Sequence, residues 1–154
     1  MAPEEQSSHF TTLGPGPFGP PLIGALLRIP WEFLRRRMLE RLNGRGFGDL
    51  EAAHLSVFQF PGPQGAKPSE LAARLGSSKQ SINHLLGQLE RLGYLERRDD
   101  PDDLRSRRIH LTRRGKAACL TIRDAVTEVE HDWERRLGPR RFALLRHLLR
   151  ELSE

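Results

Sequence analysis

The sequence has few cysteines, few lysines and no long apolar run. Its 154 residues include one cysteine, Cys119, so neither an internal disulfide nor a thiolate zinc site can hold the fold. No stretch approaches the ~18 uninterrupted apolar residues that a membrane helix needs. The first thirty residues also lack a basic start followed by an apolar stretch, which is the pattern of a secretion signal. These absences predict a soluble, cytoplasmic protein.

The length and the apolar content predict one folded domain, or one domain with a dimerisation arm. Hydrophobic residues make up 37% of the chain and 14 glycines add to them, which is ordinary for a globular protein and excludes wholesale disorder.

Positive charge is carried by arginine and is concentrated in one segment. Only three of the 25 cationic residues are lysine. Arginine pairs bidentately with phosphate, although coding bias in a GC-rich genome explains the excess equally well. Residues 97–116 contain eight cations and four acids, so they hold +4 of the net +5. Such a local basic patch predicts contact with nucleic acid.

The N-terminal third predicts an arm followed by two helices. Repeated proline and glycine predict a flexible arm over residues 1–19. Apolar residues recur at three and four over 21–43 and predict a helix, with a kink or two abutting pieces at Pro30. Asp49 resembles the N-cap of a second helix with a buried stripe, whose members would be Leu50, Ala53, Val57 and Phe58.

The middle of the chain predicts a helix-turn-helix. A short helix over 68–75 begins at Pro68, with Glu70 placed to reach back to its start, and Gly76 ends it. Ser77 or Ser78 then caps a fourth helix. Its inward stripe is formed by Ile82, Leu85, Leu86, Leu89 and Leu92. Two short helices joined by about three residues are typical of this motif.

Residues after Gly93 predict a wing and two further helices. Strand-like alternation over 94–98 and 107–111 encloses a polar turn, which predicts a β-hairpin. Thr112 is placed to cap a long helix that ends near Leu137, and a last helix follows Gly138-Pro139. The predicted fold class is therefore mainly α with a two-stranded β wing.

The predicted organisation places a winged helix-turn-helix domain at 49–112 between helices at 20–48 and 113–154. The flanking helices have apolar stripes and no room for a core of their own. We therefore expect them to pair with the same helices of a second copy, in a two-fold homodimer.

Three strings in this order resemble the MarR family of bacterial transcription regulators. They are SELAARLG from Ser69, SKQSINHLLGQLERLGYLERR from Ser78, and DPDDLRSRRIHLTRRG from Asp100. The chain departs from the family pattern in two places. Leu104 stands where a wing arginine is usual, and Lys67-Pro68 replaces the usual polar cap of the third helix, a change expected to matter little.

The resemblance implies a regulator, most simply a repressor, that binds a near-palindromic operator in bacterial cytoplasm as a homodimer and is released by a small ligand. The polar face of the fourth helix and the wing would contact the duplex, with Arg105 as the tip that enters the minor groove. The expected DNA-binding residues are Lys79, Gln80, Ser81, Asn83, His84, Gln88, Arg91, Arg105 and Arg107. The carboxylates of Asp100 and Asp103 would orient the wing, Asp103 by holding Arg105 or Arg107. The alternative for the helix is an ordinary solvated face.

A candidate ligand pocket and several weaker signals complete the analysis. MarR-like proteins commonly bind a small aromatic or phenolic anion, and aromatic walls with one cation suit it. The expected lining residues are Trp31, Arg35, His54 and Phe58, unless the aromatic residues belong to the core. Cys119 falls on an apolar stripe, which favours a packing role over redox sensing.

The chain shows no sequence pattern of an enzyme, a cofactor site or a metal site, so no catalytic residue is predicted. The alternative function is that of a winged-helix nucleoid protein or a protein-interaction module with no specific operator.

Overall fold

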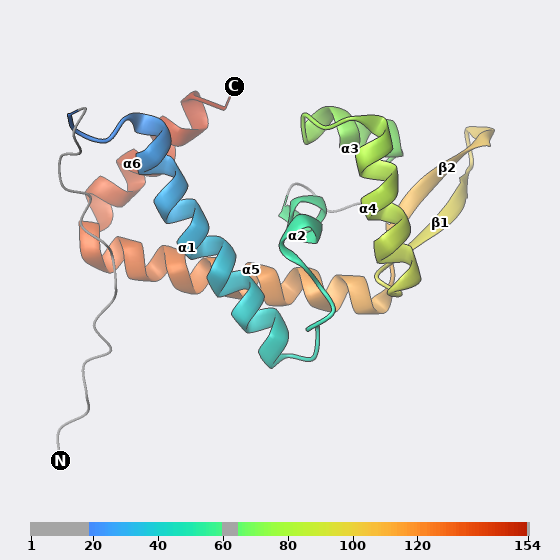
Figure 1. The fold of residues 1–154 in the computed structure, drawn as a ribbon, viewed down its shortest axis with the longest axis horizontal. Helices are drawn as coiled ribbons and strands as arrows, with labels where there is room; N and C mark the ends of the chain where they lie inside the picture. The colour runs from blue at the N-terminus through green and yellow to red at the C-terminus, as the bar shows by residue number, and fades with distance from the viewer. Residues whose placement is uncertain (1–18, 60–64, 154) are drawn as a thin grey trace, which may run out of the picture. The chain divides into compact units, whose positions relative to one another are not determined.

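The computed structural model describes residues 19–59 and 65–153, except the side chains of Gln59 and Leu104. In these ranges six helices and one antiparallel hairpin follow each other along the chain (Figure 1). The elements are α1 (Ile23–Gly44), α2 (Ala52–Gln59), α3 (Pro68–Arg74), α4 (Lys79–Arg91), β1 (Leu95–Asp100), β2 (Asp103–Leu111), α5 (Arg113–Leu137) and α6 (Pro139–Glu151). The predicted arm at 1–19 lies outside the described residues but for Gly19. None of the described helices is both long and apolar enough to cross a membrane.

Helix α1 runs without interruption through Pro30, so the expectation of two abutting pieces is wrong. Proline fixes φ near its helical value and removes one hydrogen bond, which a helix of 22 residues tolerates. The chain divides into two compact units within α1, between Phe33 and Leu34. In the first unit, the apolar side chains at the start of α1 are exposed. They are Leu22, Ile23, Leu26 and Leu27.

The second unit, from Leu34 onward, has one hydrophobic core. Met38 and Leu42 contribute from the second half of α1, and Leu55 and Val57 from α2. The other buried side chains come from every later element except α6, whose one buried residue is Phe142. The leucines at 144, 145, 148, 149 and 152 on α6 are exposed.

Helix α2 begins later than its predicted cap, so the assignment of Asp49 as an N-cap is wrong. The helix starts at Ala52, and the amide of Glu51 donates to Nδ1 of His54 at 3.0 Å. Of the predicted buried stripe, Leu50, Val57 and Phe58 are buried, whereas Ala53 is exposed and Leu55 is buried instead.

The helix-turn-helix follows the sequence prediction closely. The amide of Lys67 donates to Glu70 at 3.0 Å, as the spacing indicated, and the short helix ends before Gly76. Of the two candidate caps for α4, Ser78 is the one used, because its hydroxyl accepts from the amide of Ser81 at 3.1 Å. Ile82, Leu86 and Leu89 are the fully buried members of the inward stripe.

The β-hairpin is longer than predicted, and a third segment of the chain pairs with it. Strands β1 and β2 pair from Leu95 opposite Leu111 out to Asp99 opposite Arg107, with an irregularity before Asp100. Ala66 forms an isolated antiparallel bridge with Ile109. The segment before α3 therefore extends the base of the wing, a pairing that no local pattern of residues indicates.

A close backbone approach fixes the junction between the wing and α5. Thr112 caps α5 by accepting from the amide of Gly115 at 3.1 Å, as predicted, and its own amide donates to the carbonyl of Tyr94 at 3.0 Å. A Cβ atom at Gly115 would lie 2.1 Å from that same carbonyl oxygen. Only glycine therefore fits at this position.

Candidate nucleic-acid interface

Helix α4 exposes a continuous polar face opposite its buried stripe. Six of the predicted contact residues lie on it with exposed side chains, namely Lys79, Gln80, Ser81, Asn83, His84 and Arg91. The hydroxyl of Ser81 already accepts from Ser78 at 2.8 Å as part of the helix cap. Lys79 and Arg91 form no ion pair with any other described residue, so both charges are available to an anion outside the protein.

Gln88 differs from the other predicted contact residues because a buried histidine holds it. Its Oε1 lies 3.3 Å from Nε2 of His54 on α2, whose other ring nitrogen accepts from Glu51. Since Nδ1 is an acceptor, Nε2 carries the proton and donates to Gln88. His54 is only 3% exposed. Gln88 therefore links α2 to α4, a role that helical periodicity does not reveal.

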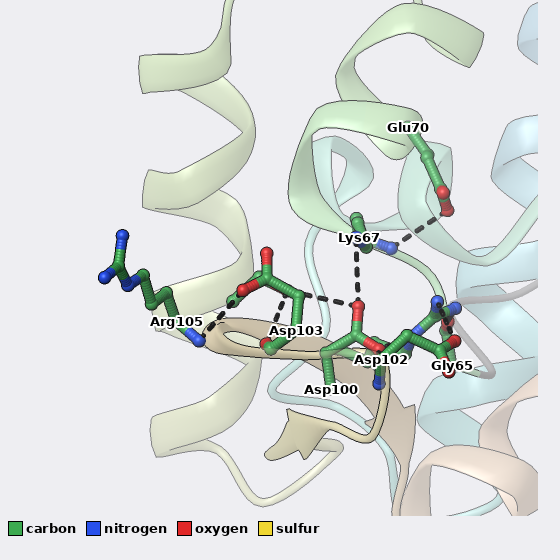
Figure 2. Close-up of polar contacts among 9 residues, drawn as sticks. Gly65, Lys67, Glu70, Asp100, Asp102, Asp103 and Arg105 are labelled. Atoms are coloured by element: carbon green, nitrogen blue, oxygen red, sulfur yellow. Dashed lines mark hydrogen bonds and ion pairs between the residues drawn. The ribbon is translucent and has the colours of Figure 1, made fainter.

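The turn of the hairpin presents Arg105 to solvent. Oδ1 of Asp103 accepts from the backbone amide of Arg105 at 3.1 Å, and the Arg105 side chain extends away from the polar cluster around Asp100 (Figure 2). Arg107 pairs at 3.7 Å with Asp99. Asp103 thus shapes the turn through the backbone, and the described side chains do not include the expected contact from Asp103 to either guanidinium.

Asp100 is a fully buried carboxylate that joins the wing to α3. Lys67 Nζ and Arg108 Nε each lie 3.0 Å from it, and the Ser106 hydroxyl and Asp102 amide donate to it at 3.1 Å (Figure 2). Hydrogen bonds from Arg108 and then Lys67 hold the pKa of this carboxyl far below its usual range. Asp100 thus binds a neighbouring arginine and a turn amide, and its role in orienting the wing stays a prediction.

Lys67 does more than its place in the sequence indicated. Helix α3 still begins at Pro68, as predicted, and the Lys67 ammonium is in addition one of the two cations that neutralise the buried carboxylate of Asp100. No local signal connects residues 67 and 100, which lie far apart along the chain.

A second polar network anchors the end of α4. The Tyr94 hydroxyl donates to Asp49 at 2.5 Å, and Arg114 pairs with the same carboxylate at 2.8 Å while lying 4.4 Å from the Tyr94 ring centroid. Burial and then the bond to Asp49 raise the pKa of Tyr94. Burial opposes ionisation of Asp49, but the Tyr94 bond and the Arg114 charge together lower its pKa. These long-range partners explain why Asp49 does not cap α2.

The four residues predicted to line a ligand pocket differ in exposure. His54 and Phe58 are buried, and Phe58 packs edge-on against Tyr94 with centroids 6.1 Å apart. Arg35 is half-buried, and Trp31, in the first unit, is 41% exposed. A cavity of about 300 Å³ between α1 and α5 is lined by Arg37, Arg41 and Glu128 among others and includes none of the four. The pocket stays a prediction.

Cys119 is a half-buried thiol on α5. Burial raises its pKa to about 11, so little of it is the reactive thiolate at neutral pH. Among the residues that the structure describes, no group of three histidine, cysteine or acidic side chains is placed to hold a metal ion.

Comparison with known proteins shows which family this architecture resembles. Residues 50–106, which include the helix-turn-helix and the turn of the wing, match the model of the MarR family. The transcriptional repressor MprA of Escherichia coli K12 is 39% identical over 86 residues, which cover 53% of this chain and 49% of MprA. Residues 50–106 of this chain therefore have the sequence pattern of the MarR family. The chain spans about half the length of the curated relatives that it matches.

Solved MarR-family structures share the fold over most of the chain. Apo MarR from E. coli aligns with a TM-score of 0.65 at 24% identity, over 87% of this chain and 98% of that one. A Mycobacterium tuberculosis MarR family protein in complex with salicylic acid aligns with a TM-score of 0.62 at 23% identity, over 86% and 96%. At such identities the likeness concerns the fold, a MarR-type winged helix with flanking helices.

Proposed function

We propose that this protein is a sequence-specific DNA-binding transcriptional regulator. The observation that carries the proposal is the exposed polar face of α4 beside a hairpin whose tip presents Arg105, which forms no ion pair with any other described residue. Gln80 and Asn83 have the amides that pair bidentately with adenine, and Arg105 suits the negative potential of a narrow minor groove. The relatives that match by sequence are described as transcriptional regulators, MprA as a repressor, which favours regulation over catalysis.

We further propose that the protein acts as a homodimer through the helices at 20–48 and 113–154, with 49–112 as the DNA-binding domain. The exposed leucines of α6 and the exposed apolar residues at the start of α1 support this assignment, because such surfaces are usually covered. A dimer would present two copies of α4 to half-sites about one helical turn apart.

Release by a small aromatic acid is the regulatory part of the proposal. The salicylic acid complex of the M. tuberculosis relative supports this ligand class. The matching test is thermal unfolding across a panel of aromatic acids, with and without Trp31→Ala. A melting temperature that no acid changes would contradict it.

The decisive experiment selects bound duplexes from a random pool and measures binding by mobility shift. If the dimer neutralises about eight phosphates, the log–log salt slope is about −7. Replacing Gln80, Asn83 and Arg105 together by alanine should abolish the preference for the selected sequence, since each good base contact contributes about 1–3 kcal/mol of discrimination.

The matched control is Arg98→Ala, which removes an arginine that the same hairpin pairs with Glu96 at its exposed surface. This variant should keep the preference for the selected sequence. Binding of the unaltered protein to all duplexes equally would instead support the nucleoid alternative, and absence of duplex binding would refute the proposal.

A further inference from the structure

A basic cleft lies between the helix-turn-helix and the wing. Its volume is about 400 Å³, and four of its eight lining residues are lysine or arginine while none is acidic. The start of α3, the exposed face of α4 and both strands of the hairpin contribute to it. The lining residues are Lys67, Pro68, Ser69, Lys79, Asn83, Arg97, Ser106 and Arg107.

Several hydrogen-bond donors in the cleft are not committed within the protein. Lys79 has no ion-pair partner among the described residues, and Ser69 is exposed with its hydroxyl free of any bond to them. Arg97 uses Nε to bond Glu90 at 3.1 Å, which leaves the donors of its two Nη groups. Lys67 and Ser106 are different, because both are bound to the buried Asp100.

The hairpin register places Arg97 and Arg107 on one face of the wing. Arg97 is opposite Ile109, and Arg107 is two residues before Ile109, so both arginines share its face. Arg98 and Arg108 pair with each other on the opposite face. The two neighbouring arginines of β1 therefore lie on different sides of the hairpin, and only Arg97 lines the cleft.

The geometry of duplex DNA indicates what this cleft would hold. A major groove and the minor groove next to it are separated by a single sugar–phosphate strand. If α4 enters the first and Arg105 the second, as the proposed function requires, that strand passes between them, where the residues of the cleft lie. Cations and hydroxyl or amide donors are the groups that proteins use against phosphate oxygens.

Building on the proposed function, we propose that this cleft is a seat for one phosphodiester strand. Its main contact is Arg97, which is not among the DNA-binding residues expected from the sequence. Lys79 and Arg107 flank the strand, and Ser69 donates to its oxygens. Gln80, Asn83 and His84 remain the residues that read bases. Asp100, through Lys67 and Ser106, fixes both sides of the cleft.

The test compares Arg97→Gln with Arg98→Gln by fluorescence anisotropy against salt, on a selected duplex and a random one. Each substitution removes one charge from the same hairpin. Each also removes one ion pair, which Arg97 forms with Glu90 and Arg98 forms with Glu96. Losing one phosphate contact should make the log–log slope shallower by about 0.9 for each bound copy of Arg97→Gln. It should weaken binding to the two duplexes by the same factor. Arg98→Gln should leave the slope unchanged.

A second arm locates the contact on the DNA. Single phosphates of the selected duplex are replaced by uncharged methylphosphonates, and the step that weakens the unaltered protein most should not weaken Arg97→Gln further. Equal slopes for the two glutamine variants, or full additivity at every methylphosphonate, would overturn the seat while duplex binding itself still stood. Loss of the sequence preference in Arg97→Gln with an unchanged slope would also overturn it, because that is the signature of a base contact. If the unaltered protein bound no duplex, the proposed function and the seat would both fall.

Discussion

Replacing Gly115 by alanine should destabilise the protein through one backbone clash. The added Cβ would meet the Tyr94 carbonyl oxygen at 2.1 Å, and such contacts are essentially never below 3.0 Å, so the two segments must separate by about 0.9 Å (3.0 − 2.1). That shift strains the bond from the Thr112 amide to the same oxygen. Overpacking costs about 1–3 kcal/mol and the hydrogen bond about 1 kcal/mol, giving about 2–4 kcal/mol.

The assay is thermal unfolding followed by circular dichroism at fixed protein concentration. For a chain of this length the loss corresponds to a fall in melting temperature on the order of 10 °C. Gly87→Ala is the matched control, since it lies inside α4 with no atom within 4 Å of the added Cβ, and it should stabilise by about 0.5–1 kcal/mol. A Gly115→Ala variant that melts within about 2 °C of the unaltered protein would refute the reasoning.

Two further predictions concern the buried polar networks. Tyr94→Phe should lower the free energy of unfolding in urea by about 1.5–3 kcal/mol, because it removes a hydrogen bond to the charged Asp49. In an Asp49→Asn background the loss should be much smaller, and equal losses in both backgrounds would show that the bond contributes nothing. Asp100→Asn should lower the melting temperature at pH 7. Since the pKa of Asp100 is depressed from its ordinary 3.8, its ionised form stabilises the fold above that pH, and the difference should shrink as the pH falls below about 4. A difference that stays constant from pH 7 to pH 3 would contradict this.

Elements defined by local chemistry were predictable from the sequence. The caps by Ser78 and Thr112, the contact from Glu70 back to Lys67 and the buried stripe of α4 all depend on residues three or four apart. Such contacts can be recognised in a sequence, because a helix brings residues three or four apart together whatever the rest of the chain does.

Elements that depend on distant partners were not predictable. Asp49 has the residue type and position of a cap, yet Tyr94 and Arg114 bind its carboxylate from 45 and 65 residues away. The bridge between Ala66 and Ile109 is equally remote, and no alternation marks it.

The residues of the candidate interface were likewise predictable only where local spacing identifies them. Periodicity identified the exposed residues of α4, because the polar face is the complement of the buried stripe. It also included Gln88, which the structure commits to His54, and it gave no reason to single out Lys67 or Arg97. Their roles depend on how the hairpin lies against α3 and α4. That arrangement cannot be predicted from a single sequence.

The bond between His54 and Gln88 limits how the proposed DNA interface is best redesigned. An engineer seeking a new target sequence would randomise the outward positions of α4, and Gln88 belongs to that set by spacing alone. The Gln88 amide holds α2 through His54, so many variants at position 88 would loosen α2. Positions 80, 83 and 84 can be varied without breaking this bond.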